Sequence, residues 1–292
     1  MSKVKSYWPV CLVIFSYILL LICYLQDIIS GHLFIGTLFL ELIAVSIWLS
    51  VQGYRKRVSR KSLLAVGVLW FIIGYEQPVV NFSTHTFNVK TYNKPKEIVE
   101  GSNLYMMIEN TVGVPLLENE GHVRNIFVQE SNSVVNIYPI DNKDRYRSKN
   151  IALQDAFGLH ETAFETMYRK AKEYFGEEEL HVQSFFERDD IDGDSVGLVL
   201  GLSELFARNE MQNTISIGVT GTLEGNGDVR GIEGVKEKVQ IATQSSLHYL
   251  IVPRENFEEA EAENQSLQLK LQIFAVGTID EAKQVIQELN QP

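Results

Sequence analysis

The chain has 292 residues, a formal net charge of −11 at pH 7 and two cysteines. Residues 1–81 carry seven Lys/Arg against three Asp/Glu, which leaves 19 basic and 34 acidic residues for 82–292. The net acidic C-terminal part argues against a nucleic-acid-binding protein, in which a basic surface is expected. Because Cys11 and Cys23 both lie near the N-terminus, residues 82–292 hold no disulfide, no cysteine metal site and no catalytic thiol.

Three apolar segments at the front of the chain predict a membrane domain over residues 1–81. Residues 7–25 are nineteen residues without a charge, about the length that spans a bilayer. Residues 32–51 form a second segment, interrupted only by Glu41. The third, 63–75, is short and reaches a spanning length only if it continues to residue 80. An ionisable group inside a span is a functional candidate, but Glu41 also fits helix packing or a place near the interface.

The basic residues between these segments predict their orientation. Lys3 and Lys5 precede the first segment, whereas the connection at 26–31 has no basic residue and the connection at 54–62 has five. Basic connections stay in the cytoplasm, so the N-terminus is expected inside. A third crossing then places the C-terminal part outside the cytoplasm, whereas two crossings would leave it in the cytoplasm.

Residues 82–120 are expected to be a linker that becomes strand-rich, and residues 121–292 a compact domain of mixed helices and strands, in the α+β class. Period-two apolar patterns predict strands at 124–130, 133–140, 179–186, 214–223, 248–253 and 269–276. Period-3.6 patterns predict helices at 151–175, about 195–208, 234–246, 255–264 and 278–289, with Thr278 as a cap of the last. The sequence "GNGD" at 225–228 predicts a turn.

The stretch "IDGDSVGLVLGL" places Ser195 between two glycines, at the start of an expected helix. A serine nucleophile needs an exposed hydroxyl, a base within reach and donors for the developing oxyanion. Gly193 permits a sharp turn, and a helix N-terminus supplies free N–H groups. A serine at this position also fits an ordinary helix cap, which is the more common role.

No spacing among the histidines identifies a general base for Ser195. His85 lies in the linker, and no Ser-His-Asp pattern involves the other histidines of the C-terminal part, His122, His160, His181 and His248. A lysine acts as a base when burial or a nearby cation lowers its pKa. Lys238, in "GVKEKVQIA", precedes an apolar run, so it fits either a base on the less exposed helix face or a solvated surface lysine.

Other chemistry finds little support in the sequence. No G-x-x-x-x-G-K-[ST] motif occurs, so we expect no ATPase within this chain. The acidic run "RDDIDGD" lacks the closing Glu of a twelve-residue calcium loop. We expect no metal and no cofactor.

Residues 120–290 resemble the proteolytic domain of the Lon family. Asp192-Gly193-Asp194-Ser195-Val196-Gly197 is similar to the family motif D-G-[PD]-S-A-G, with Val196 in place of alanine. "GIEGVKEK", which ends at Lys238, is similar to P-I-G-G-L-K-E-K and lies 43 residues after Ser195, about the family separation. Between them, Thr220-Gly221 matches a T-G pair.

The resemblance implies a Lon-protease-like C-terminal domain behind an N-terminal bundle of transmembrane helices. By carry-over, Ser195 and Lys238 form a catalytic dyad and Thr220 helps to hold the lysine. Gly193 and Asp194 support the serine, with N–H groups near Asp194 and Ser195 as oxyanion donors. The expected function is that of a membrane-anchored, ATP-independent serine endopeptidase acting on unfolded or partly cleaved proteins. Expected partners are such peptides and membrane lipid, and a homo-oligomer is compatible because Lon-like domains often form rings.

Two departures from the family pattern leave an alternative open. Gly231 replaces a proline and Glu233 replaces a glycine ahead of Lys238. A carboxylate near Lys238 would raise rather than lower the pKa of the amine. The alternative is therefore a catalytically weak or inactive Lon-like domain that binds peptides or regulates a membrane partner.

Overall fold

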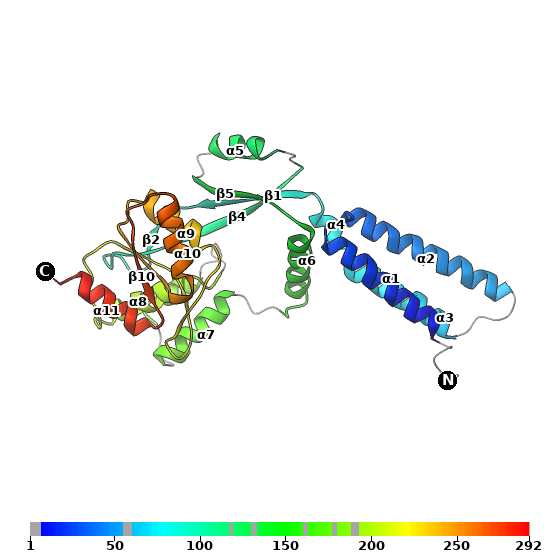
Figure 1. Ribbon diagram of the computed structural model, residues 1–292. Helices are drawn as coiled ribbons and strands as arrows, with labels where there is room; N and C mark the ends of the chain where they lie inside the picture. The colour runs from blue at the N-terminus through cyan, green and yellow to red at the C-terminus, as the bar shows by residue number, and fades with distance from the viewer. Residues whose placement is uncertain are drawn as a thin grey trace. The chain divides into compact units, whose positions relative to one another are not determined.

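The computed structural model describes residues 7–54, 60–116, 119–129, 133–159, 163–176, 180–187 and 193–291 (Figure 1). The chain divides into two compact units whose residues interleave. The first comprises Met1–Asn88, Gly113–Val123 and Tyr138–His160, and the second comprises Val89–Val112, Arg124–Ile137 and Glu161–Pro292. The segment 82–120 is therefore divided between the two units, with Val89–Val112 in the second unit and the rest in the first.

The first unit contains the apolar helices α1 (Trp8–Leu25), α2 (Gly31–Tyr54) and α3 (Arg60–Glu76), followed by the short α4 (Val79–Phe82). Three windows are long and apolar enough to cross a membrane: Trp8–Leu25, Gly31–Val51 and Leu63–Phe82. The inner faces of these helices pack through buried side chains such as Phe34, Leu38 and Leu69, and Tyr24 stacks on Phe34. Large apolar side chains on the outer faces are exposed, among them Phe15, Leu40 and Phe71. Lipid, rather than water, is the solvent that suits such a surface.

The third apolar segment is longer than its uncharged core because the helical stretch continues past Tyr75. Glu76 ends α3 and is fully buried, where it accepts hydrogen bonds from the hydroxyls of Tyr17 and Tyr146. Glu41, the other acidic residue inside an apolar helix, accepts a 3.1 Å hydrogen bond from Ser16 Oγ on α1. That contact is consistent with the packing interpretation of Glu41.

Two expected elements around the middle of the chain differ from the structure. Of the segment 124–130, expected as a strand, the described residues 124–129 belong to α5 (Glu120–Gln129), in which Val123 and Phe127 are buried four residues apart on one helical face. The expected long helix 151–175 is two helices, α6 (Asn142–Ala156) and α7 (Ala163–Phe175). Gly158, at φ +63°, ends α6 in a Schellman motif in which Leu159 N–H bonds to Gln154 O and Gly158 N–H to Asp155 O.

A three-stranded sheet has the order β4-β1-β5, formed by β1 (His85–Tyr92), β4 (Glu109–Pro115) and β5 (Ser133–Pro139). The strand expected at 133–140 is confirmed, and strands also occur within residues 82–120. The strand expected at 179–186 is wrong: the described residues there form a 3₁₀ helix, η2 (Gln183–Glu187), with Leu180, Val182 and Phe185 buried.

The second unit is built on a five-stranded sheet of order β10-β9-β6-β3-β2, in which β2 alone is antiparallel. Its strands are β2 (Lys96–Glu97), β3 (Leu104–Met106), β6 (Ile217–Val219), β9 (Tyr249–Pro253) and β10 (Gln272–Val276). A small hairpin, β7 (Thr222–Leu223) with β8 (Val229–Arg230), turns at the expected "GNGD". The sequence patterns at 214–223, 248–253 and 269–276 therefore predicted strands correctly.

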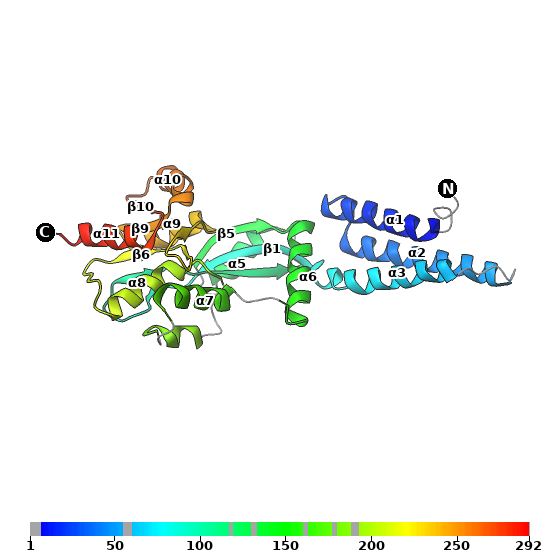
Figure 2. The same ribbon diagram turned by 90° about the horizontal axis from the view of Figure 1, so that it is seen from below.

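Helices cover both faces of this sheet. Ile251 packs into a core with α8 (Gly197–Ala207) and α11 (Ile279–Leu289), whereas its neighbours Leu250 and Val252 pack on α9 (Val235–Gln244) and α10 (Phe257–Ser266). This alternation is the two-residue period of a strand buried on both faces. Figure 2 shows α7 and α8 on one side of β6 and β9 and α10 on the other. Between β9 and α10 lies the short η3 (Arg254–Asn256), and Thr278 caps α11 as expected by accepting from Glu281 N–H.

Candidate active site

Ser195 lies in a tight turn that leads into α8. Gly193 has φ +112°, a conformation that other residues rarely adopt, and Gly197 N–H donates to the carbonyl of Asp194. The helix begins at Gly197 with Val196 as its N-cap, and no side chain caps it. Among the described residues, no partner is recorded for the Ser195 hydroxyl. The common alternative, a serine that caps the helix, therefore does not apply to this residue.

The backbone carbonyl of Ser195 is fixed from the end of strand β6. It accepts a 2.8 Å hydrogen bond from Gly221 N–H and a 3.1 Å hydrogen bond from Thr220 Oγ1. In return, Leu198 N–H donates to the Gly221 carbonyl. Thr220 is fully buried, so its hydroxyl has no competing water. These bonds tie the start of α8 to the carboxyl end of β6 and set the position of Ser195.

Lys238 lies on the buried face of α9. This helix starts after Gly234, which has φ +72°, and it presents Val235, Lys238, Val239 and Ala242 to the sheet. Lys238 is 2% exposed, and its Nζ donates a 2.8 Å hydrogen bond to the carbonyl of Met107. The alternative of a solvated lysine is therefore wrong for this position. Lys236, two residues earlier, is the exposed lysine of this helix.

The register of the sheet brings the contacts of Lys238 and Ser195 to neighbouring strand ends. β3 and β6 are parallel, with Met106 opposite Val219. The next residues along each strand are Met107, which accepts from Lys238, and Thr220, which donates to Ser195. Adjacent strands lie about 4.8 Å apart. Lys238 and Ser195 are thus each bonded to a residue just past the carboxyl end of a strand, and the two strands, β3 and β6, are neighbours.

A cluster of charged side chains surrounds the base of α9. Lys90 Nζ lies 3.0 Å from Glu109 Oε1 and 3.3 Å from Glu237 Oε1. Asn136 Nδ2 donates to Glu237 Oε1 at 3.1 Å, and Glu109 Oε2 is buried without a recorded partner among the described residues. We call Lys90, Glu109 and Glu237 the ionic cluster. It joins residues from β1, β4 and α9 beside the buried amine.

Burial is the main cause of a lowered pKa at the Lys238 amine. Glu109 opposes this shift, the positive charge of Lys90 adds to it, and Glu237 opposes it. For Lys90 itself, burial acts to lower the pKa, but Glu109 and then Glu237 outweigh burial and raise it. Burial acts to raise the pKa of Glu237, but hydrogen bonds from Asn136 and its own N–H, with the charge of Lys90, lower it. The cluster therefore favours the charged form of Lys90, whereas burial lowers the pKa of the Lys238 amine.

The carboxylates that act most on Lys238 are Glu109 and Glu237, not the Glu233 that the sequence singled out. Glu233 is exposed. No pattern in the sequence pointed to Met107, Lys90, Glu109 or Asn136, because strands far apart in the sequence bring these residues to α9. Glu237 adjoins Lys238 in sequence, but the helical period alone would place adjacent residues on different faces.

Other polar groups of the described residues lie elsewhere. His181 bonds to Glu204, whose carboxylate also accepts from Val182 N–H and Arg208. Burial acts to raise the pKa of Glu204, but these hydrogen bonds outweigh it and lower the pKa. This arrangement fastens the segment before η2 to α8. Within the described residues no group of three His, Cys, Asp or Glu could hold a metal, and the run 188–192 and His160 lie outside them.

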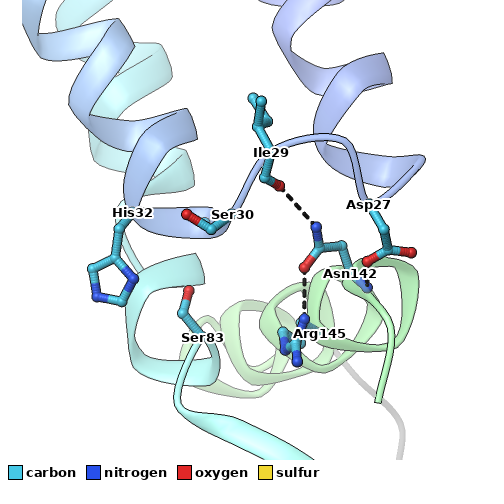
Figure 3. A pocket seen from close by; sticks show the side chains of 8 residues that line it. Asp27, Ile29, Ser30, His32, Ser83, Asn142 and Arg145 are labelled. Atoms are coloured by element: carbon cyan, nitrogen blue, oxygen red, sulfur yellow. Dashed lines mark hydrogen bonds between the residues drawn. The ribbon is translucent and has the colours of Figure 1, made fainter. Parts of the chain in front are cut away.

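A polar cavity of about 310 Å³ lies in the first unit, whereas Ser195 belongs to the second (Figure 3). It is lined by Asp27, Ile29, Ser30, Gly31, His32, Ser83, Asn142 and Arg145. Asn142 donates to the carbonyl of Ile29 and accepts from Arg145, whose remaining recorded bonds go to the carbonyl of His85. The polar groups of the wall are thus largely used to join α6 to the α1–α2 connection.

Comparisons with known proteins find relatives of the C-terminal part of the chain. Residues 153–289 match the family model of the Lon protease (S16) C-terminal proteolytic domain. This part of the chain is therefore similar to the proteolytic domain of Lon proteases. It contains α8, with Ser195 just before it, and α9, with Lys238.

Curated Lon proteases are similar to the chain over the same domain. An archaeal Lon protease of Archaeoglobus fulgidus is 25% identical over 123 residues, which is 40% of this chain and 19% of that protein. The Lon protease of Lachnoclostridium phytofermentans is 25% identical over 114 residues, 39% of this chain and 14% of that protein. The Lon protease of aster yellows witches'-broom phytoplasma is 28% identical over 107 residues, which is 37% of this chain and 14% of that protein. The chain thus spans less than a fifth of the length of these relatives.

Proposed function

We propose that the protein is a membrane-anchored serine endopeptidase in which Ser195 is the nucleophile and Lys238 the general base. The Lon-type domain supports peptidase chemistry. The observation that carries the assignment is the buried Lys238 amine, bonded to Met107 at the strand end next to the one that holds Ser195. Desolvation of that amine favours its neutral form, which is the form that can accept a proton.

The reaction follows from these roles. Ser195 Oγ attacks the carbonyl carbon of the scissile peptide bond, and its proton passes to the neutral Nζ of Lys238. The resulting ammonium gives that proton to the leaving amine nitrogen as the C–N bond breaks, which leaves an ester on Ser195. Water then attacks the ester and loses a proton to Lys238. Lys238 returns the proton to Ser195 Oγ as the carboxylic product leaves.

The turn before α8 supports stabilisation of the oxyanion. Within the described residues, no acceptor is recorded for the N–H groups of Asp194 and Ser195, and Gly193 leaves open space beside them. We assign these N–H groups to the tetrahedral oxyanion, where a preorganised donor typically contributes about 3 kcal/mol. Thr220 is a positioning residue in this scheme, because its hydroxyl bonds to the Ser195 carbonyl. The support of Lys238 by Thr220, expected from the family resemblance, stays a prediction.

The membrane and substrate assignments are parts of the same proposal. Three apolar helices anchor the chain, and the basic connection at 54–62 orients the C-terminal domain outside the cytoplasm. The residues of this chain carry no P-loop, so we propose hydrolysis without ATP. A peptidase that does not unfold its substrate is expected to cleave unfolded or partly cleaved proteins.

The test is hydrolysis of a fluorescently labelled unfolded protein by the full chain in lipid nanodiscs, with and without ATP. We expect cleavage that ATP does not change and that Ser195→Ala and Lys238→Met abolish. Lys236→Met, an exposed lysine on the same helix, should cleave at the wild-type rate. Wild-type chain that binds the labelled substrate but leaves it intact under all conditions would overturn the enzyme assignment and support the peptide-binding alternative.

A further inference from the structure

Helix α6 is fastened across one end of the apolar bundle in the first unit. Near its start, Asn142 Nδ2 donates to the carbonyls of Tyr24 at 2.9 Å and Ile29 at 3.0 Å, at the connection between α1 and α2. One to two turns later, Tyr146 and Lys149 both donate to Glu76 at the end of α3. These contacts fix α6 at the level where the apolar helices end.

The ion pair in this contact is fully buried. Lys149 Nζ lies 3.1 Å from Glu76 Oε2, and both side chains are 0% exposed. The ammonium also lies 3.9 Å from the centre of the Tyr75 ring and 4.1 Å from that of Tyr146. A buried pair with these additional partners resists displacement, because separating the charges would leave each of them desolvated. The position of α6 on the bundle is therefore strongly determined.

The last turns of α6 extend beyond these contacts. The last recorded bond to the bundle is from Tyr75 Oη to Asn150 Oδ1, and the helix continues to Ala156. At 1.5 Å per residue, six further residues add about 9 Å. Figures 1 and 2 both show α6 lying across the bundle, with its C-terminal end projecting past it.

The face that meets the bundle continues along the projecting end as an apolar stripe. At 100° per residue, Asn142, Tyr146, Lys149, Leu153 and Phe157 fall within about 80° of one another. Phe157, just after the helix, is 73% exposed. The Schellman motif then turns the chain back at Leu159, which is 77% exposed. Ile151 lies on the opposite face of α6.

We propose that the C-terminal end of α6 is a membrane-surface anchor, with Leu153, Phe157 and Leu159 inserted at the boundary between lipid headgroups and acyl chains. The first part of this helical face covers the bundle end, so its continuation lies over the lipid that surrounds the bundle. Apolar side chains at this depth are favourable, as in helices that lie in the plane of a membrane. The occupant is thus the bilayer that holds α1–α3, and the inference does not depend on peptidase activity.

The experiment uses tryptophan fluorescence in the full chain. Trp8, Trp48 and Trp70 are replaced by phenylalanine, and Phe157→Trp is introduced in that background. The protein is reconstituted in vesicles of phosphatidylcholine brominated at shallow or deep acyl positions. We expect a blue-shifted emission that shallow bromines quench at least twofold more than deep ones and that aqueous iodide barely quenches. Ile151→Trp is the matched control and should respond to iodide but not to bromine.

Two results would overturn the assignment. Emission from Phe157→Trp that iodide quenches as strongly as Ile151→Trp would show that the stripe faces water. Emission shielded from both iodide and brominated lipid would show that protein, such as a second copy, covers it. Leu159→Trp provides an independent reporter if Phe157→Trp does not reconstitute. The bundle contact is monitored separately through retention of helical circular dichroism in the vesicles.

Discussion

The Nζ of Lys238 donates a 2.8 Å hydrogen bond to the backbone carbonyl of Met107, 131 residues earlier in the chain. No other acceptor is recorded for this amine among the described residues. An ammonium has three hydrogens to satisfy, whereas a neutral amine keeps a lone pair free. Burial of an incompletely bonded cation is costly, which is the physical reason for the lowered pKa of this amine.

The pH dependence of stability should reveal the state of Lys238. The pKa of this amine is lower in the folded chain than in the unfolded chain, so between the two values the unfolded state binds more protons. Stability should therefore rise with pH through that window. Lys238→Met should remove this contribution to the slope, while Lys236→Met should retain it. Thermal unfolding from pH 6 to 10 measures both, and equal slopes for wild type and Lys238→Met would contradict the burial of a titrating amine.

We expect the ionic cluster to set the pH above which the proposed peptidase activity appears. Activity is expected to rise as Lys238 loses its proton. Lys90→Met removes a positive charge that lowers the pKa of Lys238, so the ascending limb of the rate profile should move to higher pH. Glu109→Gln removes the carboxylate that most raises this pKa and should move the limb to lower pH. Peptide hydrolysis against pH is the measurement.

Lys90→Arg keeps the positive charge, so the ascending limb of its rate profile should lie at the same pH as that of the wild type. If Lys90→Met, Lys90→Arg and Glu109→Gln all lose activity while the ascending limb stays at the wild-type pH, the ionic cluster has a purely structural role.

Thr220 should affect the rate more than the fold. Thr220→Val keeps the shape of the buried side chain but removes the donor to the Ser195 carbonyl. A lost neutral hydrogen bond costs about 1 kcal/mol of stability, whereas a small displacement of a nucleophile can cost about 100-fold in rate. We expect kcat to fall about 10- to 100-fold with little change in KM. Thr220→Ser retains a hydroxyl and should recover most of the rate.

Gly193 should be required for activity because of its backbone angle. Gly193→Ala places a side chain at φ +112°, a strain of about 1–3 kcal/mol, although no heavy atom of the described residues lies within 4 Å of the new methyl group. The turn is expected to relax and displace Ser195, which would abolish cleavage. Gly158→Ala is the matched control, since Gly158 also has positive φ and open space but lies at the end of α6. Similar losses of activity in both variants would indicate general destabilisation.

The pair of Glu76 and Lys149 should behave as a coupled unit. Lys149→Met leaves the Glu76 carboxylate buried without its cation, and we expect a loss of about 3–5 kcal/mol. Glu76→Gln alone should cost a comparable amount. The double variant should be more stable than the sum of the single losses predicts. Unfolding of the full chain in mixed detergent micelles measures the free energies of this double-mutant cycle. Additive losses of unfolding free energy would show that the two charges do not interact.

Local sequence patterns succeeded where one short segment carries the whole signal. The apolar lengths identified the three helices that are long and apolar enough to span a membrane, and the alternation in 248–253 and 269–276 identified β9 and β10. They failed at 124–130 and 179–186, where a few alternating apolar residues also fit a helix or a 3₁₀ turn. They failed again at 151–175, because the left-handed conformation of Gly158 interrupts a pattern that is otherwise continuous.

The sequence by itself determined the candidate nucleophile and base, since the motifs around Ser195, Thr220 and Lys238 are local and lie in the order of the Lon family. It could not decide whether Ser195 caps a helix or whether Lys238 meets solvent. Those properties depend on contacts between distant segments: the sheet sets Met107 beside Thr220, and Lys90 and Glu109 come from other strands. Only the tertiary structure decided them, because burial and the pKa of an amine depend on neighbours in space, which no local spacing encodes.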